Sequence, residues 1–342
     1  MALKRVTLLD IANACGFSRN TVSKVFNNRG DVPEATRNII LKKSREMGYY
    51  QLPGDASESY ESEKGNVALL TSSNSISHAF GVSFLRGFTN QMSRRGYNLK
   101  IYEIDPAEVE SRLLPPHLHL PDMSGLVAIE LFDKDYLAML SSLGVPTIFV
   151  DCFAGAGSSV IQSDVISMDS FASSITLTEH LIKAGAKKIG FVGDIRHCLS
   201  FEERWIGYCA ALRRKGIEPA HECSILAEDC DGYGDPAWML SQLNGLPEIP
   251  DAFVCANDFI AISLMAALKQ KGLSIPADVM VTGFDGSPES SVVEPALTTA
   301  RIPGADIGRM AADILLNQIE NPGRPFMRTY VKTEPVFRGS TR

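Results

Sequence analysis

The first residues of the chain have apolar positions at the spacing of two short helices. Residues 7–28 read TLLDIANACGFSRNTVSKVFNN, and the apolar residues of LLDIA recur at helical intervals. Thr7 and Asp10 have the spacing of a capping box, which predicts a helix start at this point. Gly16 is a typical helix-ending residue, and Ser18 can cap a second helix.

The predicted second helix separates an inner face from a polar outer face. Thr21, Val22 and Val25 lie three or four residues apart and can pack on the first helix. The residues left on the outer face are Arg19, Asn20, Ser23, Lys24 and Asn27. Two short helices whose second member exposes amides and cations are typical of a helix-turn-helix that enters the major groove of DNA. The alternative interpretation is a small helical hairpin with a polar outer face.

A third helix is predicted to complete this N-terminal segment. Pro33 suits the first position of a helix, and Gly48 can end it. Between them, Ile39, Ile40 and Met47 can supply apolar contacts to the other two helices.

From Asn66 onward, short apolar runs alternate with helical stretches. Buried strands are predicted for NVALLT, YNLKIYEI, SGLVAIEL, VPTIFVD, KKIGFVGD, AFVCAND and DVMVTGFDG. The stretches between them, such as SITLTEHLIKAG and IAISLMAALKQKG, have helical periodicity. This alternation predicts parallel sheets with helices on both faces. Because about 278 residues is large for one such sheet, we expect two α/β lobes.

Charge is distributed unevenly between the two parts of the chain. The formal net charge of the 342 residues is −7. Residues 1–50 contain nine Lys or Arg residues and four acidic residues, whereas the other 292 residues contain 24 and 36. A basic head of net charge +5 on an acidic body of −12 indicates that only the head contacts nucleic-acid phosphates.

Several classes of protein are disfavoured by composition and motifs. The seven cysteines form no C-x-x-C pair, which argues for a reducing compartment and a cytoplasmic protein. No apolar run approaches the ~20 residues of a membrane span, and no secretory leader is recognisable. His117 and His119 form a lone H-x-H, which is weak evidence for a metal site. Since no nucleotide-binding or hydrolase motif is present, we expect neither an enzyme nor a bound cofactor.

The head closely resembles the DNA-binding domain of the lactose-repressor family of bacterial transcription regulators. The match covers nearly every position of residues 6–49. The remainder is similar to the two-lobed sensor domain of that family, which has the type I periplasmic-binding-protein fold. Its markers are FVD at 149–151, ERWIGY at 203–208, AND at 256–258, VTGFDG at 281–286, LTTARIPGADIGRMAADILL at 297–316 and FRGST at 337–341.

This resemblance implies three parts of the chain. Residues 1–50 form an all-α helix-turn-helix domain, residues 51–64 a linker, and residues 65–342 an α/β ligand-binding and dimerisation domain. Within that domain the chain is expected to cross between lobes near 161–164, 300–303 and 327–331. The predicted lobe boundaries are 65–162 with 302–328 for the first lobe, and 163–301 with 329–342 for the second.

The linker departs from the family pattern. Family members carry a hinge helix with an Ala-Arg-x-Leu signature whose leucine wedges into the minor groove. Here the matching positions hold Asp55, Ala56 and Glu58, and further acids follow at Glu61 and Glu63. Carboxylates near phosphates are electrostatically unfavourable, so we expect little insertion into the minor groove.

Polar residues follow the predicted strands of the sensor domain. Ligands of open α/β sheets bind at the carboxyl ends of strands, where this chain has Asp151, Asn257 and Asp285. Arg204 opens a helix, and Phe80 can supply an apolar wall. By resemblance, Asp151, Arg204, Asn257 and Asp285 match the effector-contacting positions of the family. For Asp258 and Asp169 a helix-capping role is the favoured interpretation, and Gly286 stands where the family often has another Asp.

Together these features predict a transcriptional regulator, a repressor that responds to a small polar effector such as a sugar or sugar derivative. The residues predicted to contact DNA are Thr7, Ser18, Arg19, Asn20, Thr21, Ser23, Lys24 and Asn27. The predicted partners are double-stranded DNA with a pseudo-palindromic operator, the effector and a second copy of the chain, with a tetramer as the alternative assembly. The alternative function is a stand-alone protein that binds a small molecule such as a sugar.

Overall fold

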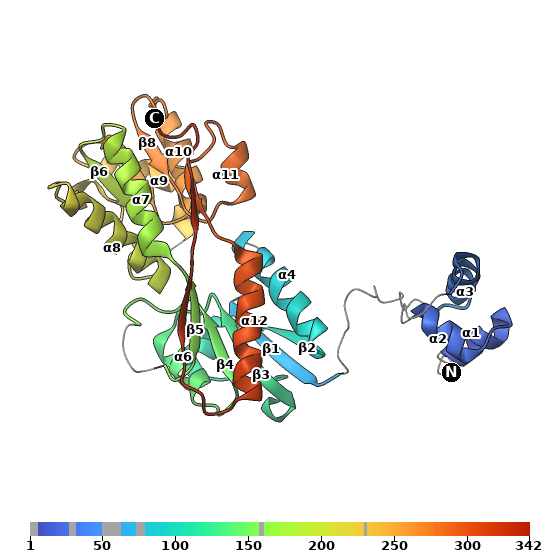
Figure 1. Cartoon of the computed structure of the whole chain (residues 1–342). Coiled ribbons are helices and arrows are strands. Elements are labelled where there is room, and N and C mark those ends of the chain that lie inside the picture. The colour runs from blue at the N-terminus through green and yellow to red at the C-terminus, as the bar shows by residue number, and fades with distance from the viewer. Residues whose placement is uncertain (1–5, 27–31, 50–62, 73–78, 157–160, 229–230) are drawn as a thin grey trace. The chain divides into compact units, whose positions relative to one another are not determined.

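The structure is a computed structural model that describes residues 6–26, 32–49, 63–72, 79–156, 161–228 and 231–342. The chain divides into two compact units, residues 1–62 and residues 63–342. Figure 1 colours the chain from blue at the N-terminus to red at the C-terminus.

The head unit contains the three predicted helices, α1 (Leu8–Cys15), α2 (Arg19–Phe26) and α3 (Glu34–Glu46). The capping box at the start of α1 is confirmed. The amide of Asp10 donates to the Thr7 hydroxyl at 3.3 Å, and the Asp10 carboxylate accepts from the Thr7 amide at 2.9 Å. The amide of Thr21 donates to the Ser18 hydroxyl at 3.0 Å, so Ser18 caps α2 as predicted.

Two details predicted for the third helix, the positions of Ile39 and Pro33, are wrong. Six side chains form the core of the head unit, namely Ile11, Ala12, Val22, Val25, Phe26 and Ile40. Ile39, which was predicted to contact this core, is 52% exposed. Consecutive residues of a helix point about 100° apart, so only one of Ile39 and Ile40 can face inward. Pro33 precedes the helix as its N-cap instead of occupying its first position.

The first lobe of the sensor unit is built on a six-stranded sheet in which all paired strands are parallel. Its order is β10-β5-β4-β3-β1-β2. The strands are β1 (Gly65–Ser72), β2 (Tyr97–Ile104), β3 (Met123–Ile129), β4 (Thr147–Val150), β5 (Asp164–Met168) and β10 (Arg328–Val331). Alternate side chains of β1 and β3 enter the cores on opposite faces of the sheet, as the period of two for strands requires.

Helices cover both faces of this sheet (Figure 1). On one face lie α4 (Ala79–Arg94) and α12 (Gly304–Glu320), and on the other lies α6 (Lys134–Ser141). A methyl group at Gly87 of α4 would overlap the carbonyl group of Ala305, and one at Gly308 of α12 would overlap that of Phe84. The close packing of α4 on α12 therefore depends on these two glycines. Lobe 1 also contains the short elements α5 (Pro106–Ser111) and η2 (Leu120–Asp122).

The second lobe is built on a three-stranded parallel sheet of order β6-β7-β8. Its strands are β6 (Ile189–Val192), β7 (Ala252–Cys255) and β8 (Met280–Thr282). The helices of this lobe are α7 (Ser170–Lys183), α8 (Leu199–Arg214), η3 (His221–Cys223), η4 (Asp231–Gly234), α9 (Pro236–Gly245), α10 (Asp258–Gln270) and α11 (Pro288–Val292). The predicted α/β class with two lobes is confirmed.

The connections between lobes correct the predicted boundaries. Strand β5 pairs with β4 in the first sheet, so the chain leaves lobe 1 after Met168 and not near 161–164. Strand β10 pairs with β5 in the same sheet, so the last crossing falls after Val331. Two polar residues in the five-residue run DVISM hid β5, whose residues are all buried in a sheet where β4 and β10 flank it.

Two crossing segments lie side by side. Strands β9 (Thr299–Arg301) and β11 (Glu334–Val336) form an antiparallel pair.

The segment YNLKIYEI needs a further correction, because it was predicted as a buried strand. It forms β2 at the edge of the sheet, where most of its side chains are exposed or half-buried.

Candidate functional site

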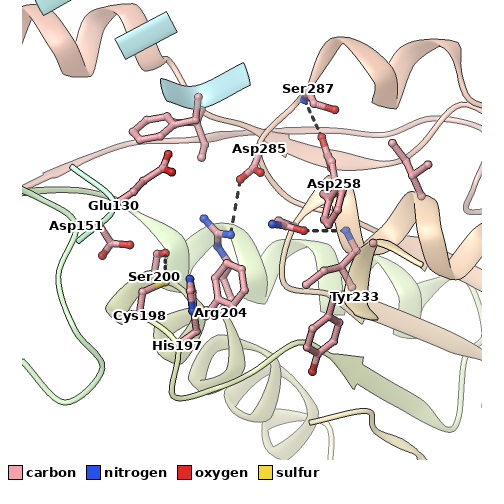
Figure 2. Close-up of a pocket in the computed structure, with 18 of the residues that line it drawn as sticks. Glu130, Asp151, His197, Cys198, Ser200, Arg204, Tyr233, Asp258, Asp285 and Ser287 are labelled. Atoms are coloured by element: carbon pink, nitrogen blue, oxygen red, sulfur yellow. Dashed lines mark hydrogen bonds and ion pairs between the residues drawn. The ribbon is translucent and has the colours of Figure 1, made fainter. Parts of the chain in front are cut away.

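A cavity of about 1030 Å³ lies between the two lobes, and Figure 2 shows side chains that line it. The five residues predicted to bind the effector all line this cavity, and they are Phe80, Asp151, Arg204, Asn257 and Asp285. Pockets of ~300–1000 Å³ hold small-molecule ligands, so the space suffices for a monosaccharide or a disaccharide. The structure brings these residues together, while their contact with an effector stays a prediction.

Arg204 is a buried charged group of the cavity that several contacts hold in place. It projects from the first turns of α8 and is 3% exposed. Its Nη1 donates to the carbonyl oxygen of Ala256 at 2.5 Å and lies 3.7 Å from Oδ1 of Asp285. The guanidinium carbon lies 3.8 Å from the ring centroid of Phe284, so the aromatic face supports the guanidinium plane. Arg204 therefore presents a fixed cationic fork to the cavity.

Asp285 joins the cavity to a connection between the lobes. Its φ is +114°, and its amide donates to the carbonyl of Ala300 at 2.8 Å. Its own carbonyl accepts from the amide of Ile302 at 3.0 Å, so both bonds tie it to the segment around β9. Burial raises the pKa of the Asp285 carboxyl, and the Arg204 guanidinium opposes that rise. A ligand held by Asp285 would thus bind a residue that is hydrogen-bonded to a segment linking the lobes.

The roles predicted for the neighbouring pair Asn257 and Asp258 are partly reversed. Asn257 caps α10, since its side-chain oxygen accepts from the amide of Ile260 at 2.9 Å. Asp258 is not a cap of its own helix. It accepts from the amide of Ser287 at 2.7 Å and from the hydroxyl of Thr299 at 2.6 Å. The prediction failed because only the tertiary structure places these two donors beside α10.

Two other predicted roles fit the geometry. Asp169 caps α7 by accepting from the amide of Ala172 at 3.1 Å, as expected. Phe80, near the start of α4, is partly buried against the core of lobe 1, and it also lines the cavity. Asn257 keeps its side-chain N–H groups for the effector contact that we predict.

Asp151 occupies a strained position at the end of β4. Its φ is +64°, and it is 6% exposed. Its Oδ1 accepts from the amide of Cys152 at 2.8 Å. Burial raises the pKa of its carboxyl, while hydrogen bonds from Ser200 and Cys198 and the charge of Arg204 act in the opposite direction. The strained backbone holds this carboxylate beside the start of α8.

Several cavity residues escaped the sequence analysis. Glu130 follows β3 with a φ of +54° and lines the cavity, as Figure 2 shows. The strand-end rule that found Asp151 could have found it. Phe132 of lobe 1 makes an edge contact with His197 of lobe 2, with ring centroids 5.0 Å apart. Phe201 lies 5.2 Å from the same imidazole. These rings come from loops and a helix start with no periodic signal, so the sequence offered no means of finding them.

A half-buried carboxyl of α8 lies against β10, the edge strand of the first sheet. The hydroxyl of Tyr330 donates to Oε1 of Glu203 at 2.8 Å, while Oε2 of Glu203 is buried without a hydrogen-bond partner among the described residues. Burial raises the pKa of Glu203 to about 7, and the Tyr330 hydrogen bond opposes the rise. Because folding favours the protonated acid, the folded chain holds a proton that the unfolded chain releases above its ordinary pKa near 4.5.

We therefore expect Glu203 to lower the free energy of unfolding as the pH rises from about 4.5 to about 7. Glu203→Gln keeps an acceptor for Tyr330 and removes the titration. After allowance for solvent screening of a partly exposed group, it should stabilise the protein at pH 8 by about 1 kcal/mol. At pH 4.5 the two proteins should have nearly equal stability. Urea unfolding of both proteins at several pH values measures this, and parallel pH curves would contradict it.

The predicted DNA-binding face is partly accessible and partly used for capping. Arg19, Asn20 and Lys24 are exposed on α2, as a surface that reads DNA requires. The hydroxyls of Ser18 and Thr21 lie 2.8 Å apart, and that of Thr7 donates to Asp10 at 2.7 Å. These three hydroxyls therefore hold the helix starts in addition to any contact with phosphates. Ser23 is half-buried.

Some predictions lie outside the described residues or gain no support. Asn27 and the acidic linker positions up to Glu61 lie outside them. Among the residues that the structure describes, no group of three or more His, Cys, Asp or Glu side chains could hold a metal ion. His119 lies instead in an exposed pair with Asp122, at 3.3 Å. No described helix has the length and apolar composition needed to cross a membrane.

Comparison with known proteins identifies both units. Residues 7–51 match the model of bacterial regulatory proteins of the lacI family, and residues 178–341 match a periplasmic binding protein-like domain. The probable HTH-type transcriptional repressor ExuR of Bacillus subtilis (strain 168) is 28% identical over 340 residues, with 98% of each chain covered. The HTH-type transcriptional repressor PurR of Haemophilus influenzae (strain PittEE) is 27% identical over 345 residues, again with 98% of each chain covered.

A solved structure agrees with these relatives. The complex of the transcriptional regulator CelR with cellobiose has a TM-score of 0.72 and 25% identity, and the match covers 98% of this chain and 100% of that one. The head, the sensor fold and the full-length relatives agree with one another. The chain therefore has the DNA-binding head of the lacI family of bacterial regulatory proteins joined to a periplasmic binding protein-like domain, and over its whole length it is similar to transcriptional repressors.

Proposed function

We propose that this repressor is controlled by a small polyhydroxylated effector, a sugar or sugar derivative, that binds between the lobes of the sensor unit. One observation carries the proposal. A cationic fork, carboxylates, an amide and an aromatic ring come from both lobes and line a single cavity. Such groups bind hydroxyls with paired, directional hydrogen bonds and leave the apolar face of a sugar ring to the aromatic side chains.

Each candidate residue has a distinct role in this proposal. Arg204 donates two parallel hydrogen bonds from its guanidinium, and Asp151 and Asp285 accept from hydroxyl groups. Asn257 donates through its amide, because its oxygen already caps α10. Phe80 covers the apolar face of the ligand.

Control of DNA binding follows from the lobe connections. We propose that the chain acts as a homodimer whose two heads read the half-sites of a pseudo-palindromic operator. Ligand held by Asp285 and Arg204 would change how the lobes close, and thereby the spacing of the heads. A ligand shifts such an equilibrium only by the difference between its affinities for the two arrangements. The alternative of a stand-alone sugar-binding protein is not favoured, since the head is a DNA-binding domain of the lacI family.

A thermal-shift screen of the full chain with sugars, nucleosides and sugar phosphates tests this function. A true effector at 100 times its dissociation constant should add about 2.7 kcal/mol to the free energy of unfolding. The same compound should change the affinity for operator DNA in a fluorescence anisotropy titration. Compounds that leave the melting temperature unchanged serve as matched controls. If no compound with several hydroxyl groups binds, the proposed effector class is wrong.

A further inference from the structure

The cavity has a surplus of acidic side chains. Among the described residues that line it, five carry carboxyl groups, and they are Glu130, Asp151, Asp258, Asp285 and Glu289. Arg204 is the single Lys or Arg side chain in the same lining, and His197 adds an imidazole. These carboxyl groups come from both lobes, so a ligand between the lobes meets acidic groups on two sides.

The guanidinium of Arg204 already has partners within the protein. Its Nη1 lies 3.7 Å from the Asp285 carboxylate and donates to the carbonyl oxygen of Ala256. The ring of Phe284 lies against its plane. Arg204 can donate N–H groups to neutral hydroxyls, whereas an anionic ligand would have to compete with the Asp285 carboxyl for the same guanidinium.

Two helix starts at the cavity have acidic residues nearby, Asp151 at α8 and Asp258 at α10. The N-terminal ends of α8 and α10 carry partial positive charge that could otherwise attract an anion. Burial raises the pKa of the Asp151 carboxyl, and Ser200 and Cys198 at the start of α8 oppose that rise. The start of α10 is capped by Asn257, and Asp258 is its first residue, so an acceptor and an acid of this protein already occupy that positive end.

The remaining carboxyls lie close enough to influence each other. Burial raises the pKa of Asp285, the charge of Arg204 opposes the rise, and the charges of Asp258 and Glu130 add to it. A further anion brought among these groups would meet like charges in a partly desolvated space, whereas a hydroxyl or an ammonium group would donate to them.

We propose that this cavity selects neutral or amino-bearing polyhydroxylated effectors and rejects those with a carboxylate or phosphate, with Glu130 as a determinant of that choice. The inference rests on the proposed function and narrows it to a charge class. We expect the dissociation constant of a neutral sugar to be at least about tenfold lower than that of its acid counterpart. Each factor of ten in this ratio corresponds to about 1.4 kcal/mol of binding free energy.

Matched probe series test the inference with the full chain. Each series contains a neutral sugar, its acid and its amine, such as galactose, galacturonate and galactosamine, or glucose, glucuronate and glucosamine. Glucose 6-phosphate tests a phosphate ester, and cellobiose with cellobionate extends the test to disaccharides. Dissociation constants from calorimetry should be at least about tenfold lower for the neutral or amino member than for the anion.

Two variants test the role of Glu130. Glu130→Gln removes one carboxylate from the cavity and should narrow the ratio of the two dissociation constants by about threefold or more. Glu110→Gln makes the same charge change at an exposed position on α5, outside the cavity, and should leave the ratio unchanged. The ratio within each protein is the readout, so a general change in affinity or stability does not imitate the effect.

The outcomes separate the two proposals. Acids or phosphate esters that bind as tightly as their neutral counterparts overturn the charge selection and leave the sugar-like effector standing. A ratio that Glu130→Gln does not alter, or that Glu110→Gln alters equally, overturns the role of Glu130. Failure of every neutral, amino and anionic probe to bind overturns the proposed function, and the inference built on it falls as well.

Discussion

Replacing Arg204 with alanine is expected to abolish the response to the effector while operator binding without effector stays close to that of the parent. The guanidinium is fixed by Ala256, Asp285 and Phe284 before any ligand arrives, so its hydrogen bonds to a ligand need little further ordering. Each charge-assisted hydrogen bond contributes about 1.5–3 kcal/mol. Loss of the fork should therefore weaken effector binding by roughly a hundredfold or more.

Damage to the fold must be distinguished from loss of ligand contact in this variant. Removing one partner of a buried ion pair costs about 3–5 kcal/mol, whereas replacing both partners is often nearly neutral. Because the pKa of Asp285 is already raised by burial, protonation of that carboxyl should relieve part of the cost. The double variant Arg204→Met with Asp285→Asn should melt close to the parent and still fail to respond to the effector.

Calorimetry and operator titrations measure both effects on the same samples. Arg196→Ala is a matched control, since Arg196 is an exposed arginine of the same lobe, in a pair with Glu228 at 3.6 Å. It should retain effector affinity and response. If Arg204→Ala and Asp285→Ala both keep full effector affinity, the effector site lies elsewhere in the protein.

Arg19→Ala and Lys24→Ala are each expected to weaken operator binding by about 1–3 kcal/mol and to relax the preference at one base position. Both side chains are exposed on α2. Arg or Lys at this position can read guanine, and Asn20 between them can read adenine. A dimer on an operator of two half-sites uses each residue twice. The loss of binding free energy on a full palindrome should therefore exceed the loss on one half-site.

Affinities for a set of operators with single base changes identify what each residue reads. Lys42→Ala removes a positive charge from an exposed position on α3 and is the matched control. It should weaken binding to all sequences equally or leave it unchanged. An equal loss on every sequence for Arg19→Ala or Lys24→Ala would assign that residue to phosphate contact and contradict base reading.

Local patterns were enough to predict the head and the class of the sensor unit. The capping box at Thr7, the helix end at Gly16 and the buried pair of Val22 and Val25 depend on residues within one or two turns of each other. Spacing along the chain specifies such contacts directly. The alternation of apolar runs and helical stretches likewise predicted the parallel sheets.

Strand ends were a good guide to the cavity, because parallel strands bring their carboxyl ends to one edge of a sheet. That rule located Asp151, Asn257 and Asp285, which all line the cavity. Applied to β3, it would also have located Glu130. The resemblance to the lactose-repressor family contributed Arg204, since no local pattern distinguishes an arginine at the cavity from one on the surface.

Contacts between distant segments were decided by the tertiary structure alone. Asp258 was expected to cap a helix, yet it binds Ser287 and Thr299, which the fold brings beside it from 29 and 41 residues away. The edge-to-face pair of Phe132 and His197 joins two lobes and has no counterpart in local spacing. Strand β5 pairs with β10, which comes from the far end of the chain. A periodic pattern indicates on which face of a helix or strand a residue lies. Only the assembled lobes determine which distant residues contact that face.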